Sequence, residues 1–465
     1  MAKDKKAAKE LTMEEKLAQA LVPVEEQPYK IPENWCWVKF EALSEDMADG
    51  PFGSNLKTEH YTTNREVRII QLSNVSENGW RDENKKYTTF EHAQTISRSI
   101  VKPGNIIITK MMPAGQAMIC PNDEKEYILS SDNVKMVPHK TLNTKYLVYV
   151  INSYVFNNQV RENTQGITRA RTSIKKLKSY SFPLAPLGEQ QRIVDRIESI
   201  YAKLDEAREK AQAVVDDFEL RKSAILHKAF TGELTKQWRK KRGIAIESWR
   251  TVPLIEISTL QTGIMKGKHF NDKTICLPYL RVANVQDGYF NLNEIKKIEV
   301  SEKMVDRYLL QKGDVLFTEG GDFDKLGRGS VWNAEIEVCL HQNHVFVVRP
   351  DKNILDPYFL SLQAGSRYGK KYFLSCAKQT TNLASINSTQ LKNYPVRLPV
   401  IEEQKEILNM VSDVLEKERQ AKEAAELVIS QIDVMKKAVL ARAFRGELGT
   451  NDPKEKAVEL LKIVL

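Results

Sequence analysis

The sequence has little that is typical of a secreted or membrane protein. Its five cysteines are odd in number and never spaced as C-x-x-C, which favours reduced thiols in a cytoplasm over a disulfide framework. No run of roughly 18 apolar residues is present, so no transmembrane helix is expected. The first ten residues lack the apolar centre of a secretory signal. We therefore predict a cytoplasmic protein with no membrane partner.

The sequence also lacks the motifs that usually carry chemistry. No G-x-G-x-x-G joins a strand pattern to a helix pattern, and no P-loop is present. The Asp-Pro-Tyr at residues 356–358 is half of an Asn/Asp-Pro-Pro-Tyr motif and is better explained as a helix start. Cys339, His341 and His344 have the chemistry of metal ligands, but strand alternation places His344 on the opposite face from the other two. We expect no catalytic residue, cofactor or metal in this chain, which would not be an enzyme.

Proline and glycine are both absent from residues 189–231, where we predict a helix about 60 Å long. Apolar residues recur there at alternating intervals of four and three, which is the period of a coiled-coil seam. The members of this seam are Ile193, Ile197, Ile200, Leu204, Ala207, Ala211, Val214 and Phe218.

This helix occurs twice. The endings Ala-Phe-x-Gly-Glu-Leu place Phe230 and Phe444 214 positions apart, and the Glu-Gln pairs at residues 189–190 and 403–404 have the same offset. In the second seam, Glu418 is the one position that is charged instead of apolar. That seam consists of Ile407, Val411, Val414, Glu418, Ala421, Ala425, Val428, Ile432, Met435 and Val439.

The blocks between the helices are diverged copies of each other. Trp35 and Trp249 are 214 positions apart, but Val134 and Val345 are only 211 apart. The blocks have therefore changed by insertion and deletion, whereas the helices kept their length. A constant length is what a spacer between two modules requires.

The predicted fold class is mixed α/β. In the first block we expect a helix over residues 145–159. Strands are expected over residues 67–72, 106–110, 127–130 and 134–138. Because the termini of a compact domain usually lie close together, the two helices should run antiparallel. The prediction is two repeated strand-rich domains joined by two long antiparallel coiled-coil helices with pseudo-twofold symmetry.

The boundaries expected from these patterns divide the chain into seven parts. At the N-terminus, Thr12 and Glu15 have capping-box spacing and Pro23 would stop a short helix, for which a docking role and a frayed tail both remain open. The parts are an N-terminal helical extension (1–25), the first domain (26–186), the first spacer helix (187–234), a basic linker (235–246), the second domain (247–399), the second spacer helix (400–448) and a tail helix (449–465).

Several loops have the composition of a polyanion-binding surface, consistent with a net charge of +9. Residues 166–178 carry five cations and no acid, and their counterpart at 378–387 keeps the polar donors but loses most of the charge. Glycine-rich loops ending in lysine correspond at residues 50–57 and 262–268. For the basic linker, phosphate contact and plain solvation both remain open.

These motifs together resemble the specificity subunit of a type I restriction–modification system. The resemblance covers nearly the whole chain, including the Glu-Gln helix entries, the Ala-Phe-x-Gly-Glu-Leu exits, the Gly-Pro-Phe-Gly-Ser loop at residues 50–54 and the Gly-Gly-Asp-x-Asp-Lys-Leu-Gly-Arg-Gly loop at 320–329. It implies a non-catalytic reader of double-stranded DNA whose two target-recognition domains each read one half of a bipartite, asymmetric target. The helices would set the gap between the half-sites.

The resemblance also implies partners. Two modification subunits would bring S-adenosylmethionine and methylate adenine, and restriction subunits would use ATP and Mg²⁺ for translocation and cleavage, so this chain would hold no cofactor itself. The candidate DNA-binding residues are Lys57, Lys110, Thr168, Arg169, Arg171, Lys175, Lys266, Lys268, Lys325, Arg328, Lys378, Gln379 and Asn382.

Two other classes of protein compete with this interpretation. A self-contained nuclease–methyltransferase would need cofactor and metal motifs, which we do not find. A non-catalytic coiled-coil scaffold that bridges other proteins would explain the helices, but not two diverged domains with basic loops. The bases of the target cannot be derived from the sequence.

Overall fold

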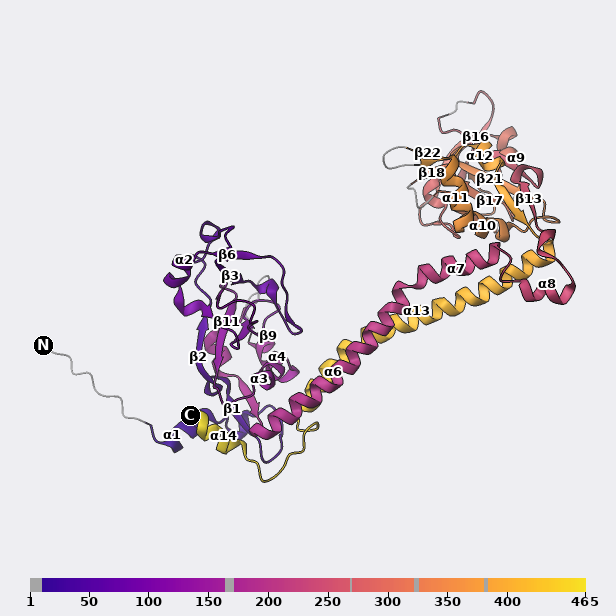
Figure 1. The fold of residues 1–465 in the computed structure, drawn as a ribbon. Helices are drawn as coiled ribbons and strands as arrows, with labels where there is room; N and C mark the ends of the chain where they lie inside the picture. The colour runs from indigo at the N-terminus through magenta and orange to yellow at the C-terminus, as the bar shows by residue number, and fades with distance from the viewer. Residues whose placement is uncertain (1–10, 164–170, 268–269, 322–325, 380–383) are drawn as a thin grey trace. The chain divides into compact units, whose positions relative to one another are not determined.

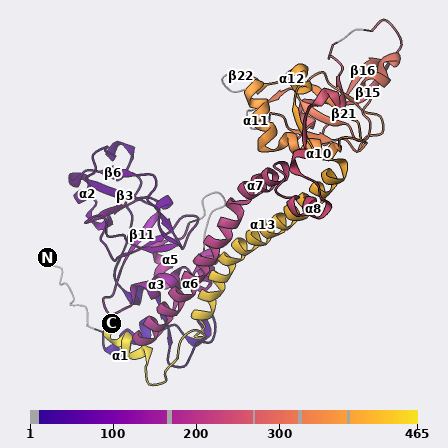
Figure 2. The same ribbon diagram turned by 45° about the vertical axis from the view of Figure 1, so that its right-hand side comes forward.

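The computed structural model describes residues 11–163, 171–267, 270–321, 326–379 and 384–465. The chain divides into two compact units (Figures 1 and 2). The first unit combines Met1–Lys210 with Val428–Leu465, and the second is Ala211–Leu427. None of the helices in the described ranges is long and apolar enough to cross a membrane.

The first domain is built on two four-stranded sheets. Each predicted strand is confirmed, because each expected range contains an observed strand with buried side chains. One sheet has the order β2 (Ser44–Asp49), β11 (Asn133–Pro138), β8 (Ile106–Thr109) and β9 (Ala117–Ile119). The other has the order β6 (Lys86–Thr88), β3 (Val67–Ile70), β10 (Tyr127–Leu129) and β7 (Ile100–Val101).

The prediction of one helix over residues 145–159 is wrong. The chain forms α3 (Thr144–Ile151) and α4 (Tyr154–Glu162), with a break at Asn152. The Asn152 side chain accepts a bond from the amide of Ala117 and donates one to its carbonyl, both at 2.8 Å. These two bonds hold the break against the edge strand β9, a tertiary contact that the apolar periodicity of the segment does not reveal.

The second domain repeats the plan of the first. Its main sheet has the order β14 (Ser258–Thr262), β21 (Val345–Pro350), β17 (Val315–Thr318) and β19 (Gly329–Val331), which corresponds strand for strand to β2, β11, β8 and β9. Its second sheet has the order β16 (Lys296–Ser301), β15 (Thr274–Leu280) and β20 (Leu340–His341). The parallel pair β15–β20 matches the parallel pair β3–β10. The predicted fold class, with two repeated strand-rich domains, is confirmed.

Long helices run antiparallel within each unit. In the first unit, the Tyr201 hydroxyl on α6 (Leu187–Asp216) donates to the carbonyl of Lys436 on α13 (Ile401–Ala443) at 3.1 Å, and Lys436 pairs with Asp205 at 2.6 Å. In the second unit, α7 (Phe218–Phe230) runs beside the first half of α13, with Leu226 and Val411 in one core. The expected unbroken first helix is instead interrupted at Asp217.

The repeated Glu-Gln motif fastens each long helix to its own domain. In the first unit, Gln190 accepts a bond from the amide of Asn143 at 3.0 Å and donates to the carbonyl of Ala185 at 2.8 Å. Asn143 is the N-cap of α3. Gln404 does the same in the second unit, since it accepts from the amide of Asp356, the N-cap of α10 (Pro357–Gly365), at 2.8 Å.

The neighbouring glutamates are fully buried acceptors. Glu189 accepts from Arg192 at 2.6 Å, from the Thr450 hydroxyl at 3.0 Å and from the Asn451 amide at 2.9 Å. Because an unpaired carboxylate inside a protein costs several kcal/mol, these donors are a condition of the fold.

The region expected to be a basic linker is a helix with a structural role. Glu403 accepts from Arg239 at 2.5 Å, from the Thr235 hydroxyl at 2.7 Å and from the Trp249 indole at 3.0 Å. Arg239 lies on α8 (Lys236–Arg242) and is buried, so it is neither solvated nor available to phosphate, and those alternatives fail at this residue.

The two ends of the described chain pack on the first domain. The Thr12–Glu15 capping box is confirmed at the start of α1 (Met13–Ala20). Helix α14 (Ala457–Val464) lies beside α1 in both views (Figures 1 and 2), and Lys16 donates to the carbonyl of Leu465 at 2.8 Å. Ala20 and Leu461 share the domain core, so the N-terminal helix is docked.

Glu418, the residue out of character in the second seam, has a partner on the facing helix. Its carboxylate pairs with Nε of Arg221 at 2.6 Å, and the same guanidinium donates to the Val214 carbonyl at 2.8 Å, next to the interruption at Asp217. The equivalent positions of the repeat are apolar, Leu204 and Met435. One layer of the seam is therefore charged in the second unit.

We predict that this charged layer can be replaced by the apolar pair of the other repeat. Glu418→Ala should destabilise the second unit by about 1 kcal/mol, because it leaves the half-buried Arg221 with only the exposed carboxylate of Asp217, 3.9 Å away. Arg221→Met combined with Glu418→Leu should restore stability to at least the parent level. Urea unfolding of the full chain, followed by circular dichroism, measures both changes.

Arg419→Ala is the matched control. This arginine forms exposed ion pairs with Glu416 and Glu423 on the same helix, and its loss should change stability little. A double variant less stable than Glu418→Ala would contradict the prediction.

Candidate nucleic-acid interface

Each domain presents a glycine-rich loop directly after an edge strand. β2 ends at Asp49 and β14 at Thr262, and the next residue in each case is a glycine pressed against a backbone carbonyl of another segment. A Cβ on Gly50 would lie 1.8 Å from the Ser130 carbonyl oxygen, and one on Gly263 would lie 2.1 Å from that of His341. Glycine is therefore required at both positions for space, and the loops leave their sheets in a fixed direction.

In the first domain the structure brings two of the predicted cationic residues together beside this loop. Arg171 forms an isolated β-bridge with Met111, and its guanidinium pairs with Asp132 at 3.2 Å. Lys110 pairs with Asp49 at 2.6 Å. Arg171, where the described part of the basic loop begins, and Asp49, which precedes the glycine-rich loop, therefore lie at the same edge of the main sheet.

The second domain has the same arrangement with different side chains. Strands β18 (Gly320–Gly321), β23 (Ala384–Ser385) and β22 (Lys378–Gln379) form a small sheet, so the Gly-Gly loop and the polar loop lie side by side. Glu319 occupies the place of Lys110 and contacts His344. The two domains therefore agree in backbone and differ in the charge of this edge.

The candidate DNA-binding residues differ in their exposure and in whether an ion pair already engages them. Lys175, Lys266 and Lys378 are exposed. Lys57 is half exposed and 3.7 Å from Glu59. Lys110 is only 17% exposed and its ion pair holds the start of the glycine-rich loop, so its contribution would be indirect.

The remaining candidates are less completely described. Arg328 donates to Gln286 at 3.1 Å, and its Nε is buried with no hydrogen-bond partner in the described part of the chain. Gln379 is described as backbone in β22. Five candidates lie outside the described residues, namely Thr168, Arg169, Lys268, Lys325 and Asn382.

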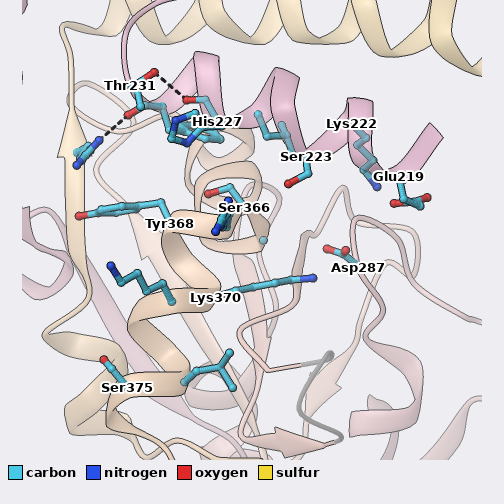
Figure 3. Close-up of a pocket in the computed structure, with 17 residues that line it drawn as sticks. Glu219, Lys222, Ser223, His227, Thr231, Asp287, Ser366, Tyr368, Lys370 and Ser375 are labelled. Carbon is cyan, nitrogen blue, oxygen red and sulfur yellow. Dashed lines mark hydrogen bonds between the residues drawn. The ribbon is translucent and has the colours of Figure 1, made fainter. Parts of the chain in front are cut away.

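A basic groove in the second unit was not expected from the sequence. It has a volume of about 970 Å³ and lies between α7 and α11 (Arg367–Cys376) (Figure 3). Arg367, Lys370 and Lys371 line it from α11, and within the described ranges none of them forms an ion pair. Their spacing of three and four residues puts them along one side of the helix.

The opposite wall of the groove carries mixed charges. Lys222 and Glu219 come from α7, and Asp287 lies near them (Figure 3). The sequence signal for the groove is the run Arg-Tyr-Gly-Lys-Lys at residues 367–371, and it is weak because cations on a helix are usually only solvated.

The cysteine and histidines considered as metal ligands are separated. His341 is buried, which lowers its pKa to about 4, and its Nδ1 lies 2.8 Å from the Val345 carbonyl oxygen, so the ring is a neutral core group. Burial raises the pKa of the Cys339 thiol to about 12. In the part of the chain that the structure describes, no three His, Cys, Asp or Glu side chains form a group that could hold a metal ion.

The chain matches, over residues 53–214 and 246–427, the family described as the type I restriction modification DNA specificity domain. The specificity subunit of the EcoKI type I restriction enzyme of Escherichia coli K12 is 24% identical over 321 residues, which are 67% of each chain. A putative type I specificity subunit, MjaX, of Methanocaldococcus jannaschii is 30% identical over 168 residues, 36% of this chain and 39% of the relative.

The fold is similar to that of a solved specificity subunit. The crystal structure of the HsdS subunit from Thermoanaerobacter tengcongensis has a TM-score of 0.61 and 20% identity, covering 91% of this chain and 100% of that one. The chain belongs to the family of type I restriction–modification specificity subunits. The predicted family is confirmed, and with it DNA recognition rather than a purely scaffolding function.

We predict that the groove cations contact the phosphate backbone. Replacing Lys370 and Lys371 by Ala should reduce the slope of log affinity against log salt by about one unit per lost phosphate contact, because each contact releases counterions. The sequence preference should not change, since phosphates carry no base identity. Binding titrations of the assembled complex between about 50 and 200 mM salt measure the slope.

The control is the same change at Lys454 and Lys456, two exposed lysines that do not line the groove and lie in none of the candidate DNA-binding segments. An unchanged slope for the Lys370 and Lys371 variant, accompanied by impaired assembly, would instead assign the groove to a protein partner.

Proposed function

We propose that each of the two domains reads one half of a bipartite, asymmetric double-stranded DNA target. The observation that supports this is the pair of equivalent sheet edges with different side chains, Lys110 beside Asp49 in one domain and Glu319 beside His344 in the other. Two domains that share a backbone arrangement but carry opposite charges at a matching position are suited to two different half-sites. Direct recognition depends on the side chains that reach base edges, and these loops supply them.

The long helices are proposed to set the gap and to dock two modification subunits. Leu220 on α7 and Val434 on α13 are 70% and 67% exposed, and they are 214 positions apart, so they are equivalent in the repeat. Within the described ranges other apolar side chains of α13 are exposed as well, but Leu220 and Val434 form a position that is exposed in both repeats, which is consistent with one modification subunit per repeat. A single exposed apolar side chain is common on protein surfaces, but one that recurs at equivalent positions of two repeats indicates a shared contact.

The chemistry is proposed to reside on other subunits. The modification subunits would bind S-adenosylmethionine, and restriction subunits would bind ATP and Mg²⁺, whereas this chain would hold no cofactor. Its neutral, buried His341 and its buried Cys339 are not poised for catalysis. We propose a cytoplasmic location, where these partners and the DNA would be found.

We expect the purified chain alone to neither methylate nor cleave DNA. The measurement is methyl transfer from labelled S-adenosylmethionine and cleavage in Mg²⁺, with plasmid DNA as substrate. Adding the modification subunits should produce methylation at one bipartite sequence. Turnover by the chain alone, in a preparation free of other subunits, would refute the assignment of chemistry to the partners.

The spacing role is tested by lengthening both long helices. Four residues, about one helical turn, are inserted between Lys210 and Ala211 and also between Leu427 and Val428, which are the boundaries of the two units. The insertion adds about 6 Å along the helices, and B-DNA rises about 3.4 Å per base pair. We expect methylation mapping to show the same half-sites with one or two more base pairs between them.

Inserting four residues in α13 alone is the control, because it shifts one helix along the other and disturbs the seam. That variant should lose stability rather than gain a defined new spacing. An unchanged gap in the double insertion, or altered bases within a half-site, would rule out the helices as the spacing element.

A further inference from the structure

The glycine-rich loops of both domains expose a large apolar side chain at the same place. Phe52 is 82% exposed and Met265 is 64% exposed. Each lies three residues after the end of its edge strand, Asp49 in the first domain and Thr262 in the second. Within the described ranges, no large apolar side chain is more exposed than Phe52.

The backbone beneath these side chains is fixed. Gly50 donates to the Asn133 carbonyl at 2.9 Å, and neither Gly50 nor Gly263 has room for a Cβ atom. Ile264 donates to the His341 carbonyl at 2.9 Å and accepts from the Asn343 amide at 3.0 Å. Each tip therefore projects from a loop that is stitched to its sheet one or two residues earlier.

The repeat makes this feature informative. The surrounding positions have changed between the domains, since Gly50-Pro51 is matched by Gly263-Ile264 and Lys110 by Glu319. The residue at the tip differs between the two domains, but the type of side chain does not, because Phe and Met are both long, apolar and unbranched at Cβ. One exposed apolar residue needs no explanation, but two at equivalent positions on diverged loops indicate a shared contact.

The neighbouring charges indicate what the contact is. An exposed lysine follows each tip, Lys57 in the first domain and Lys266 in the second. In the first domain, Arg171 also forms an ion pair with Asp132, the neighbour of the residue that binds Gly50. An apolar tip flanked by cations suits a base step flanked by phosphates better than an apolar protein surface, where lysine is depleted. Phe and Met are among the side chains that wedge between stacked bases and kink a duplex.

We propose that Phe52 and Met265 are paired wedges, each of which enters a base step of the half-site that its own domain reads. This rests on the proposed assignment of one half-site to each domain. The wedge unstacks one step at a cost that depends on the bases, so each domain also selects its half-site by how easily that step opens. Phe52 and Met265 are then specificity-determining residues that form no hydrogen bond with a base.

The test uses the complex of the full chain with its modification subunits and a duplex carrying the target mapped by methylation. The fluorescent base 2-aminopurine replaces each adenine in turn, except the methylated ones, and brightens where stacking is lost. We expect the parent complex to raise fluorescence at one step in each half-site. Phe52→Ala should abolish the rise in the first domain's half-site only, and Met265→Ala in the second domain's only, each with about 5- to 100-fold weaker binding.

Two further variants keep the result interpretable. Phe52→Leu retains an apolar wedge and should preserve most of the fluorescence rise. Val24→Ala removes a side chain that is 81% exposed away from the loops and should change neither fluorescence nor affinity.

The proposal is overturned if the Ala variants keep both fluorescence signals, if Phe52→Ala acts on the wrong half-site, or if the variants lose only assembly with the modification subunits. In each of those cases the parent complex still methylates its bipartite target, so the assignment of half-sites stands. Failure of that assignment looks different, because the parent complex would then show no sequence-specific binding.

Discussion

A buried carboxylate at the start of each long helix is the constraint on which the arrangement of each unit depends. Glu403 sits fully inside the protein and is neutralised by Arg239, which the chain supplies only by folding residues 236–242 into a helix. Glu189 obtains its donors from Arg192 and from the segment that follows α13. In both units, a helix entry is thus locked to a segment distant in sequence by a charge that cannot be left unpaired.

The two copies of this lock differ in how they are filled. Thr235 donates to Glu403, whereas the equivalent residue of the other copy is Gly449, where a Cβ would lie 1.7 Å from a Glu189 oxygen. Trp249 also donates to Glu403, but the indole N–H of Trp35 has no partner among the described residues. The same charge is therefore satisfied by two different sets of donors.

Periodicity and internal repetition were sufficient to predict the fold class, the positions of the strands and the capping box at Thr12. They did not predict the break at Asn152 or the burial of Arg239, because both depend on a partner that is remote in the sequence, Ala117 in one case and Glu403 in the other. The seam pattern identified Glu418 as unusual but not its partner Arg221. Pairing across two helices requires their relative register, which one helix alone does not contain.

The candidate interface was predicted where glycine or charge marked a loop, as at Gly50 and Arg171. It was missed where cations lie on a helix, as at Lys370, because a charged helix face is usually only solvated. The apolar tips were missed for a related reason. Phe52 and Met265 are different residue types. Their equivalence is established by the structure, in which each lies three residues after the end of the corresponding edge strand, β2 or β14.

The Gln190 and Gln404 contacts have a consequence for how such a protein can change. Each glutamine binds backbone groups of its own domain, at the N-cap of α3 or α10 and at the end of the last strand, and Gln404 also donates to the Ile354 carbonyl just before α10. Any inserted domain with the same backbone at those two points would accept the glutamine, whatever its loops contain. Recombination between relatives that keep this backbone, the donors to the buried glutamate and the core around Ile193 or Ile407 would therefore exchange one recognition domain without detaching it from its helix, so that a lineage acquires a new half-site in one genetic event.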